Sequence, residues 1–243
     1  SNFMPRRFEC PPGRPNLLAT LSHEDLSALE PHLSDVALPK GFSIERPGAP
    51  VKTVYFLCSG VGSTVAVSPG GRRLETALFG CEGMSGTSVV LRAGQSTHET
   101  FMQVAGEGRA VEAGKLEELL DLHRTLRHHF LRYVQVLCTQ SSQTALSNGH
   151  GKLEERLARW LLMCHDRSTS DELQLTHEFL SIMLGVRRAG VTVSTHILEG
   201  KGLIRANRGH ITILDRAGLE AEAEESYGVP EAEYVRLIGF APH

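Results

Sequence analysis

The residues best suited to bind a polyanion lie between Leu173 and Leu214. This segment contains two acidic residues, Glu178 and Glu199, and five basic ones, namely Arg187, Arg188, Lys201, Arg205 and Arg208. Its net charge is therefore +3, whereas the 243-residue chain carries a formal net charge of −3. A local basic patch on an acidic protein is what phosphate binding requires. A helical hairpin with a solvated basic face is the plainer alternative.

Two helices and a hairpin are predicted to position these basic residues. Apolar residues recur at helical spacing from Leu175 to Leu184, Thr176 can cap this helix, and Gly185 ends it. A second helix is expected from about Arg187, and its inner face is formed by Val191, Ser194, Thr195 and Leu198. Residues 203–205 and 211–214 then alternate like strands around a turn at 207–209. This order is that of a winged helix-turn-helix, whose second helix enters a DNA major groove.

The N-terminal half has the pattern of a small β-domain. Between Val36 and Phe79 apolar residues alternate with a period of two, and turn-forming Pro and Gly residues interrupt them. Short strands this closely spaced predict an antiparallel sandwich or barrel. Residues 80–94 predict a short helix and loop between strands, and residues 100–111 return to strand character.

A long helical run from about Lys115 to Ser147 follows, with a break expected near Asp121. Its second part carries a seam with a spacing of roughly 3.5 residues, which is typical of a coiled coil. We interpret this seam as a homodimer interface. The alternative is a helix packed only on its own sheet. The seam consists of Leu126, Phe130, Tyr133, Leu137, Gln140 and Thr144.

The remaining segments complete the domain plan. Asn148–Gly151 is interpreted as a hinge, and Lys152–Arg167 as an amphipathic helix that forms the floor of the DNA-binding domain. Residues 215–243 hold seven acidic and two basic residues, a net charge of −5, and are expected to form an acidic tail. The predicted domains are 1–114, a sensor; 115–148, a dimerisation helix; and 149–243, the DNA-binding domain with its tail.

The cysteines and the catalytic motifs exclude several classes of function. The five cysteines are dispersed, so we expect no metal, no cofactor and no disulfide framework, and a reducing cytoplasm fits best. No apolar run reaches the ~18 residues of a membrane span, so no membrane association is expected. No nucleophile–base pair, metalloprotease motif or phosphate loop is present, which argues against an enzyme.

Taken together, these features resemble the Crp/Fnr superfamily of bacterial transcription factors. The resemblance covers residues from about Leu17 to Leu214 and is most specific over MLGVRRAGVTVSTHILEGKGLI, Met183–Ile204. It implies an α+β fold with a cyclic-nucleotide-binding-like β-roll (a double-stranded β-helix), a long dimerisation helix and a C-terminal winged helix-turn-helix. The implied partners are double-stranded DNA at a palindromic operator, a second copy of the chain, and RNA polymerase.

The resemblance also assigns roles at the DNA. Arg188 would face base edges, followed on the same face by Thr192 and His196. Ala189 and Val193 replace an acidic and a basic base-reading residue, and can only meet a thymine methyl group, so the operator should differ from that of the catabolite activator. The remaining contacts, mostly with phosphates, are assigned to Thr176, His177, Arg187, Arg205 and Arg208.

The sensor domain departs from the members of the superfamily that bind cyclic AMP. Gly86-Thr87 and Thr97-His98 stand where those members carry Gly-Glu and Arg-Ser or Arg-Thr. A cyclic phosphate would therefore lack its charge-assisted partner. Cys10 alone cannot hold an iron–sulfur cluster, and the histidines form no haem-ligand pattern. We expect control by an unidentified effector; the alternatives are a cyclic-nucleotide-responsive regulator with an atypical pocket, and a ligand- or redox-binding module with a vestigial DNA-binding domain.

Overall fold

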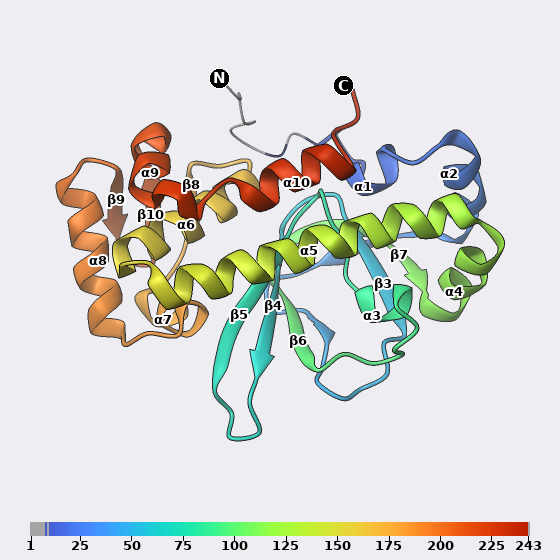
Figure 1. The fold of residues 1–243 in the computed structure, drawn as a ribbon, viewed down its shortest axis with the longest axis horizontal. Coiled ribbons are helices and arrows are strands. Elements are labelled where there is room, and N and C mark those ends of the chain that lie inside the picture. The colour runs from blue at the N-terminus through green and yellow to red at the C-terminus, as the bar shows by residue number, and fades with distance from the viewer. Residues whose placement is uncertain (1–7, 9, 243) are drawn as a thin grey trace.

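The computed structural model describes residue 8 and residues 10–242. Its β-domain consists of two antiparallel sheets with strand orders β1-β7-β3 and β2-β6-β4-β5 (Figure 1). The strands are β1 (Ser34–Leu38), β2 (Ser43–Glu45), β3 (Thr53–Leu57), β4 (Val61–Val67), β5 (Arg73–Phe79), β6 (His98–Val104) and β7 (Gly106–Glu112). A short helix, α3 (Thr87–Val90), lies between β5 and β6. The strands predicted from the period-two pattern, and the inserted helix, are confirmed.

Short helices precede the sheets and join the core beneath them. They are α1 (Asn16–Ala19), α2 (His23–Leu29) and the single turn η1 (Glu30–His32). The Ser22 side chain caps α2 by accepting a hydrogen bond from the Asp25 amide. Leu17 and Leu29 are fully buried, so these helices close one end of the β-domain.

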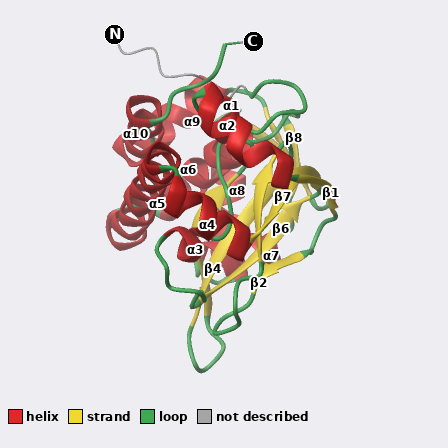
Figure 2. Cartoon of the chain, turned by 90° about the vertical axis from the view of Figure 1, so that its right-hand side faces the viewer, coloured by secondary structure: helices red, strands yellow, loops and turns green. Residues whose placement is uncertain are grey.

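Two helices connect the β-domain to the rest of the chain. They are α4 (Ala113–Leu122) and α5 (Arg124–His150), so the break predicted near Asp121 is confirmed. The predicted hinge begins later than expected, because α5 continues through Asn148 and Gly149 and ends at His150. Figure 2 shows α5 lying outside the strands, beside the C-terminal helix.

The face of α5 that we predicted to contact a second copy lies largely inside the single chain. Leu126, Phe130, Tyr133 and Gln140 are each no more than 2% exposed. The Phe130 ring packs 5.4 Å from the Phe56 ring of β3, and the Gln140 amide hydrogen-bonds both the N–H and the carbonyl of Leu78 in β5. These four residues cannot form a dimer interface, because the helix uses them to pack on its own β-domain. Leu137 and Thr144 are half-buried.

The C-terminal half forms the winged helix-turn-helix that the sequence predicts. Its elements are α6 (Leu153–Asp166), β8 (Glu172–Gln174), α7 (His177–Leu184), α8 (Arg188–Gly200), β9 (Ile204–Asn207) and β10 (His210–Ile213). The three strands form one sheet in the order β8-β10-β9. The predicted inner face of α8 is confirmed, because Val191, Ser194, Thr195 and Leu198 are all buried. Strand β8 is an addition that the sequence did not indicate.

The acidic segment after Leu214 folds back on the molecule. It forms α9 (Arg216–Ala223), the turn η2 (Glu224–Ser226) and α10 (Val229–Leu237). Helix α9 packs on α6, and α10 packs on α5. Glu231 and Tyr234 of α10 are almost fully buried. The acidic segment is therefore packed helix and not a tail that projects into solvent, because the apolar residues between the charges give these helices a packing face.

The structure also contradicts the prediction for the cysteines. Cys10 and Cys81 form a disulfide across a sequence separation of 71 residues, with their Cα atoms 6.1 Å apart. Cys58, Cys138 and Cys164 are free thiols. Sequence spacing could not indicate this pair, because the fold brings the two residues together from distant segments. In residue 8 and residues 10–242, no three His, Cys, Asp or Glu residues are placed to hold a metal ion.

The β-domain and the helix-turn-helix share one apolar core. Val61, Val65 and Leu78 from β4 and β5 pack with buried residues of α6, α7 and α8. Helix α7 also rests on β5, where Gly185 at its end (φ 64°) approaches the Leu74 side chain. Within the described part of the chain, no helix is long and apolar enough to span a membrane.

A buried polar cluster lies within this shared core. Trp160 of α6 donates its indole N–H to Glu75 Oε1 at 2.7 Å, and burial raises the pKa of Glu75 to about 8. The Ser63 hydroxyl lies 2.8 Å from both Glu75 Oε2 and the Gln103 amide oxygen. One hydroxyl donates only one hydrogen bond, so a protonated Glu75 that donates to Ser63 satisfies both contacts. At neutral pH Glu75 is therefore mainly a neutral carboxylic acid.

Candidate nucleic-acid interface

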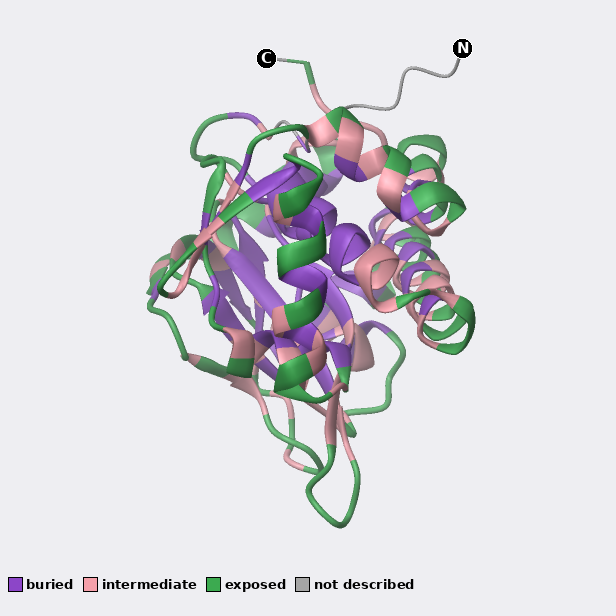
Figure 3. Ribbon diagram, turned by 90° about the vertical axis from the view of Figure 1, so that its left-hand side faces the viewer, coloured by how far each residue is buried: buried purple, intermediate pink, exposed green. Residues whose placement is uncertain are grey.

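The helix-turn-helix presents α8 on the outside of the molecule. The Thr176 hydroxyl caps α7 by accepting from the Phe179 amide at 3.1 Å, and Gly185 makes the turn into α8 in the left-handed conformation. Figure 3 views the end of the molecule that carries α8 and shows exposed turns along this helix. Because its inner residues are locked in the core, α8 holds its outer residues on a rigid support.

The outward face of α8 combines basic and apolar side chains. Arg188, Ala189, Val193 and His196 are exposed, and 59% of the Val193 surface is accessible. A large aliphatic side chain this exposed is unfavourable in water and is well suited to contact a thymine methyl group. These predicted residues are thus brought together on one face.

Thr192, predicted to read bases, is already engaged. Its hydroxyl donates to the Arg188 carbonyl at 3.2 Å and lies 2.9 Å from His177 Nδ1. Burial lowers the pKa of His177, and the nearby Arg188 and His196 lower it further. A neutral His177 donates to Thr192 and supports the start of α8 rather than supplying charge to DNA.

The wing lies beside α8 and adds two more basic residues. Arg205 in β9 and Arg208 in the turn are exposed. A groove of about 450 Å³ runs between α8 and the wing; it is lined by Thr176, His177, Arg188, Thr195, His196, Glu199, Ala206, Asn207, Arg208 and Gly209. The Glu199 carboxylate accepts the Ala206 amide at 2.8 Å and so fixes the wing to α8. In the sequence Glu199 enters only the net charge of the segment, although an acidic residue between two basic elements is a signal for such a contact.

The basic side chains on this surface differ in whether they are free to bind a phosphate. Lys201 is held by Glu222 of α9 at 2.7 Å. By contrast, Arg187, Arg188, Arg205 and Arg208 are exposed and form no ion pair with any carboxylate in the described residues. We call the exposed set the recognition surface; it consists of Arg187, Arg188, Ala189, Val193, His196, Arg205 and Arg208. Four free guanidinium groups on one end of an acidic protein suit a phosphate backbone.

The predicted effector pocket is only partly assembled. The Gly86 amide donates to Glu45 Oε1 at 2.7 Å, so a carboxylate of the chain itself takes this N–H group. Burial raises the pKa of Glu45, while hydrogen bonds from Gly86 and Thr100 and the charge of nearby His98 lower it. Thr87 begins α3, and Thr97 is exposed. Gly86 and His98 therefore lie near one carboxylate, where an anionic ligand would be repelled.

Aromatic residues of α5 fill the space beneath this site. The Tyr133 hydroxyl approaches the Gly83 backbone so closely that a Cβ on Gly83 would lie 2.1 Å from it. Phe130 and Phe56 pack against each other beside it, and Met84 is only 1% exposed. The region between α3 and α5 is thus a packed core. Two arginines of the β-domain, Arg92 and Arg109, are paired with Glu117 and Asp35.

The DNA-binding part of the chain matches a known protein family. Residues 155–222 match the family described as the Crp-like helix-turn-helix domain. This chain carries a Crp-like helix-turn-helix domain. The Crp-like domain thus spans α6 to α9 and includes the whole recognition surface. No curated protein matches the chain.

Solved structures show that the Crp/Fnr-type fold extends over most of the chain. A Crp/Fnr-family transcriptional regulator from Eubacterium rectale is 20% identical, with a TM-score of 0.69 over 85% of this chain and 97% of that one. FixK2 from Bradyrhizobium japonicum is 16% identical, with a TM-score of 0.66 over 79% and 98%. The global regulator CLP from Xanthomonas campestris, described as c-di-GMP responsive, is 18% identical, with a TM-score of 0.63 over 79% and 99%.

Proposed function

We propose that this chain is a transcriptional regulator that binds a palindromic operator as a homodimer through the recognition surface. The observation that carries the proposal is the exposed face of α8, with four unpaired arginines beside a rigid wing, in a Crp-like domain. Arg188 reads a base edge, whereas Arg187 and Arg208 hold phosphates. RNA polymerase is the proposed downstream partner, and the cytoplasm the proposed location.

The homodimer is proposed to form through the outer face of α5. Exposed residues there recur at alternating spacings of four and three, as in a coiled-coil seam; they are Leu131, Gln135, Cys138, Ser142 and Ala145. Leu146 of α5 is 55% exposed and lines one groove together with Val229 of α10, which is 48% exposed, so both add apolar surface beside this seam. A dimer places two recognition helices one turn of DNA apart, which a palindromic operator requires.

Selection from a random pool of duplex DNA tests the function directly. The wild type is expected to enrich a palindromic sequence, and an Arg188→Ala/Arg208→Ala variant is expected to enrich none. Arg46→Ala, an exposed arginine of the β-domain, is the matched control and should select the same palindrome as the wild type. Enrichment of no common sequence by the folded wild type would contradict the proposal.

Light scattering at micromolar concentration tests the dimer. The wild type is expected to show twice the mass of one chain, and Leu131→Asp/Leu146→Asp is expected to shift the mass toward the monomer. Thr125→Asp changes an exposed residue of α5 outside the seam and should leave the dimer intact. A dimer that resists the paired substitution would place the interface elsewhere.

The effector is proposed to be something other than cyclic AMP. The Glu45 carboxylate occupies the Gly86 amide, and Tyr133 packs against Gly83, so a cyclic phosphate meets a negative group and a filled space. Titration calorimetry with cyclic AMP is expected to show no binding at micromolar ligand. Saturable micromolar binding would show that this part of the β-domain opens.

A further inference from the structure

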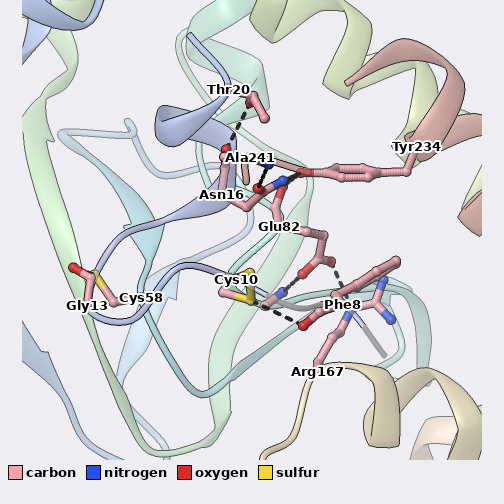
Figure 4. Close-up of a disulfide and its surroundings, with 12 residues drawn as sticks. Phe8, Cys10, Gly13, Asn16, Thr20, Cys58, Glu82, Arg167, Tyr234 and Ala241 are labelled. Atoms are coloured by element: carbon pink, nitrogen blue, oxygen red, sulfur yellow. Dashed lines mark hydrogen bonds and ion pairs between the residues drawn. A yellow bond between two sulfur atoms is a disulfide. The ribbon is translucent and has the colours of Figure 1, made fainter. Parts of the chain in front are cut away.

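The disulfide between Cys10 and Cys81 lies where three parts of the molecule meet (Figure 4). Cys10 belongs to the N-terminal segment, and Cys81 to the loop that follows β5. Both residues are half-buried, so the pair lies partly open to solvent. Figure 4 shows Phe8 and Arg167 beside Cys10, with Tyr234 of α10 on the same side.

Phe8, two residues before Cys10, is inserted between the Crp-like domain and the C-terminal helix. Its ring centroid lies 4.7 Å from the guanidinium carbon of Arg167. The ring centroids of Tyr234 and Phe240 lie 5.6 Å and 5.4 Å away from it. Its amide donates to the Asp166 carbonyl at 3.0 Å. Asp166 and Arg167 lie at the end of α6, so the N-terminal segment directly contacts the DNA-binding domain.

Glu82, next to Cys81, forms the buried ion pair of this region. Arg167 Nε donates to Glu82 Oε1 at 2.8 Å, and both side chains are 3% exposed. The Glu82 carbonyl accepts the Tyr234 hydroxyl at 2.7 Å. The disulfide therefore connects, through adjacent residues, the aromatic contact and the ion pair that attach the Crp-like domain to the β-domain. We call these residues the junction cluster; it consists of Phe8, Cys10, Cys81, Glu82, Arg167 and Tyr234.

We propose that Cys10–Cys81 is a reversible thiol–disulfide site that fixes the DNA-binding domain on the β-domain when oxidised and releases the N-terminal segment when reduced. The proposal rests on the proposed function for its setting, because a DNA regulator works where glutathione and thioredoxin keep thiols reduced. Disulfides in such compartments are usually transient and redox-sensing. The neighbouring Phe8 contacts and the Glu82–Arg167 ion pair link the state of this bond to the anchoring of the DNA-binding domain.

The chemistry balances with ordinary cellular reagents. On oxidation the two thiols give up two electrons and two protons to a hydroperoxide, which becomes an alcohol and water while the S–S bond forms. On reduction a dithiol of the thioredoxin class attacks one sulfur, the S–S bond breaks, and the reductant leaves as its own disulfide while Cys10 and Cys81 regain protons.

The oxidised state is expected to bind DNA more tightly. When the bond is broken, Phe8 is held at the end of α6 by its ring contacts and by its backbone hydrogen bond to Asp166, without the covalent link two residues away, and the chain at Cys10 regains conformational freedom. A less firmly anchored Crp-like domain must be ordered again when two recognition helices meet one operator, and that ordering reduces affinity.

Thiol labelling in denaturant after equilibration with glutathione buffers tests the bond itself. The wild type contains five cysteines, of which three are free thiols in this structure. The oxidised protein is expected to take up three alkyl groups and the reduced protein five. Cys10→Ser should take up four under both conditions, whereas Cys58→Ser/Cys138→Ser keeps the difference of two. Five labels on the oxidised wild type would overturn the proposal.

Hydrogen exchange and DNA binding test the consequence. Reduction is expected to speed exchange of the amides at the end of α6 by about ten-fold, and to weaken binding of the selected operator by about five-fold. Cys10→Ser and Cys81→Ser should behave as reduced protein and ignore the redox buffer, whereas Cys58→Ser/Cys138→Ser should respond like the wild type. Unchanged exchange and unchanged affinity in both redox states would overturn the proposal.

The two proposals fail in distinguishable ways. If no DNA is bound in either redox state while the α6 amides still respond to reduction, the redox site is supported and the regulator function is contradicted. If the operator is bound with equal affinity in both states and the α6 amides do not respond, the function is supported and the switch is overturned.

Discussion

The recognition surface and the junction cluster are built in opposite ways. The recognition surface comes from 22 consecutive residues, 187–208, and its side chains point into solvent. The junction cluster takes its residues from four separate segments around positions 8–10, 81–82, 167 and 234, and most of them are buried. The first is a surface for binding a partner, whereas the second is an internal joint. Changes to the first should alter DNA binding and leave folding intact. Changes to the second should alter stability first, and DNA binding only through the anchoring of the Crp-like domain.

The largest effect is expected at the buried ion pair of the junction cluster. Arg167→Met leaves the Glu82 carboxylate buried without its partner, so the free energy of unfolding should fall by about 3–5 kcal/mol. Lys115→Met breaks the pair with Glu118, whose two side chains are 40% and 65% exposed, and serves as the control, with a loss of at most about 1 kcal/mol. Urea denaturation measures both. Similar losses for the two variants would remove the distinction between the regions.

The next effect is a pH dependence that arises in the shared core. Burial raises the pKa of Glu75 to about 8 in the folded chain, above its value of about 4.5 in the unfolded chain. Below pH 4.5 the residue is neutral in both states. Between pH 4.5 and 8 only the unfolded chain loses the proton, so stability falls as pH rises through this window. Above pH 8 the penalty is complete.

Glu75→Gln tests this sign. Glutamine stays neutral and can still hydrogen-bond Trp160 and Ser63, so the variant should lack this loss, which is on the order of 3 kcal/mol between pH 5 and 8. Urea denaturation of both proteins across the pH range measures the difference. A variant that loses stability with pH as steeply as the wild type would show that Glu75 ionises freely in the fold.

On the recognition surface, Arg188→Ala should weaken operator binding by about 1–3 kcal/mol and relax the base preference at one position per half-site. The side chain is exposed, so the unfolding midpoint should not change. Binding titrations on operator and scrambled DNA measure the effect. Equal weakening on both would assign Arg188 to phosphates and leave the base contacts to Val193 and His196.

The smallest effect is expected at the wing. Arg208→Ala removes one phosphate contact, so all DNA sequences should be bound more weakly to the same degree, and the slope of log K against log salt should fall by about one. Titrations at several salt concentrations measure this slope, with Arg46→Ala as the control. A change in base preference would show instead that the wing reads sequence.

The sequence predicted the regions whose residues are close in the chain. Alternation gave the strands, and the buried set of Val191, Ser194, Thr195 and Leu198 followed from helical spacing alone. The recognition surface was predicted from the local cluster of basic residues and from the family resemblance. The engagement of Thr192 by His177 was not predicted. Local pattern is sufficient where an element has one apolar face and one partner.

The predictions failed in two situations. In one, the local pattern fits two faces of a helix equally well; in the other, the contact joins residues that no local pattern relates. On α5, Leu126 and Phe130 have the same four-residue spacing as Leu131 and Gln135, which lie about 140° around the helix. Spacing alone does not say which of these two faces meets the β-domain. The Cys10–Cys81 bond and the Glu82–Arg167 pair join residues 71 and 85 positions apart, which no helical or strand period encodes. The helices after Leu214 were not predicted, because the many acidic residues of this segment obscure the apolar positions that pack on α5 and α6.

The meeting of the two ends of the described chain has a practical use. The Ala241 amide donates to the Asn16 side chain, and Phe240 packs on Phe8, 5.4 Å between ring centroids. Because Phe8 and Phe240 are in contact while the disulfide is formed, a pair of dyes attached on either side of this contact would report the proposed opening by energy transfer. The protein thus carries the layout of an optical redox reporter, in which energy transfer between the dyes would follow the state of a single bond in real time.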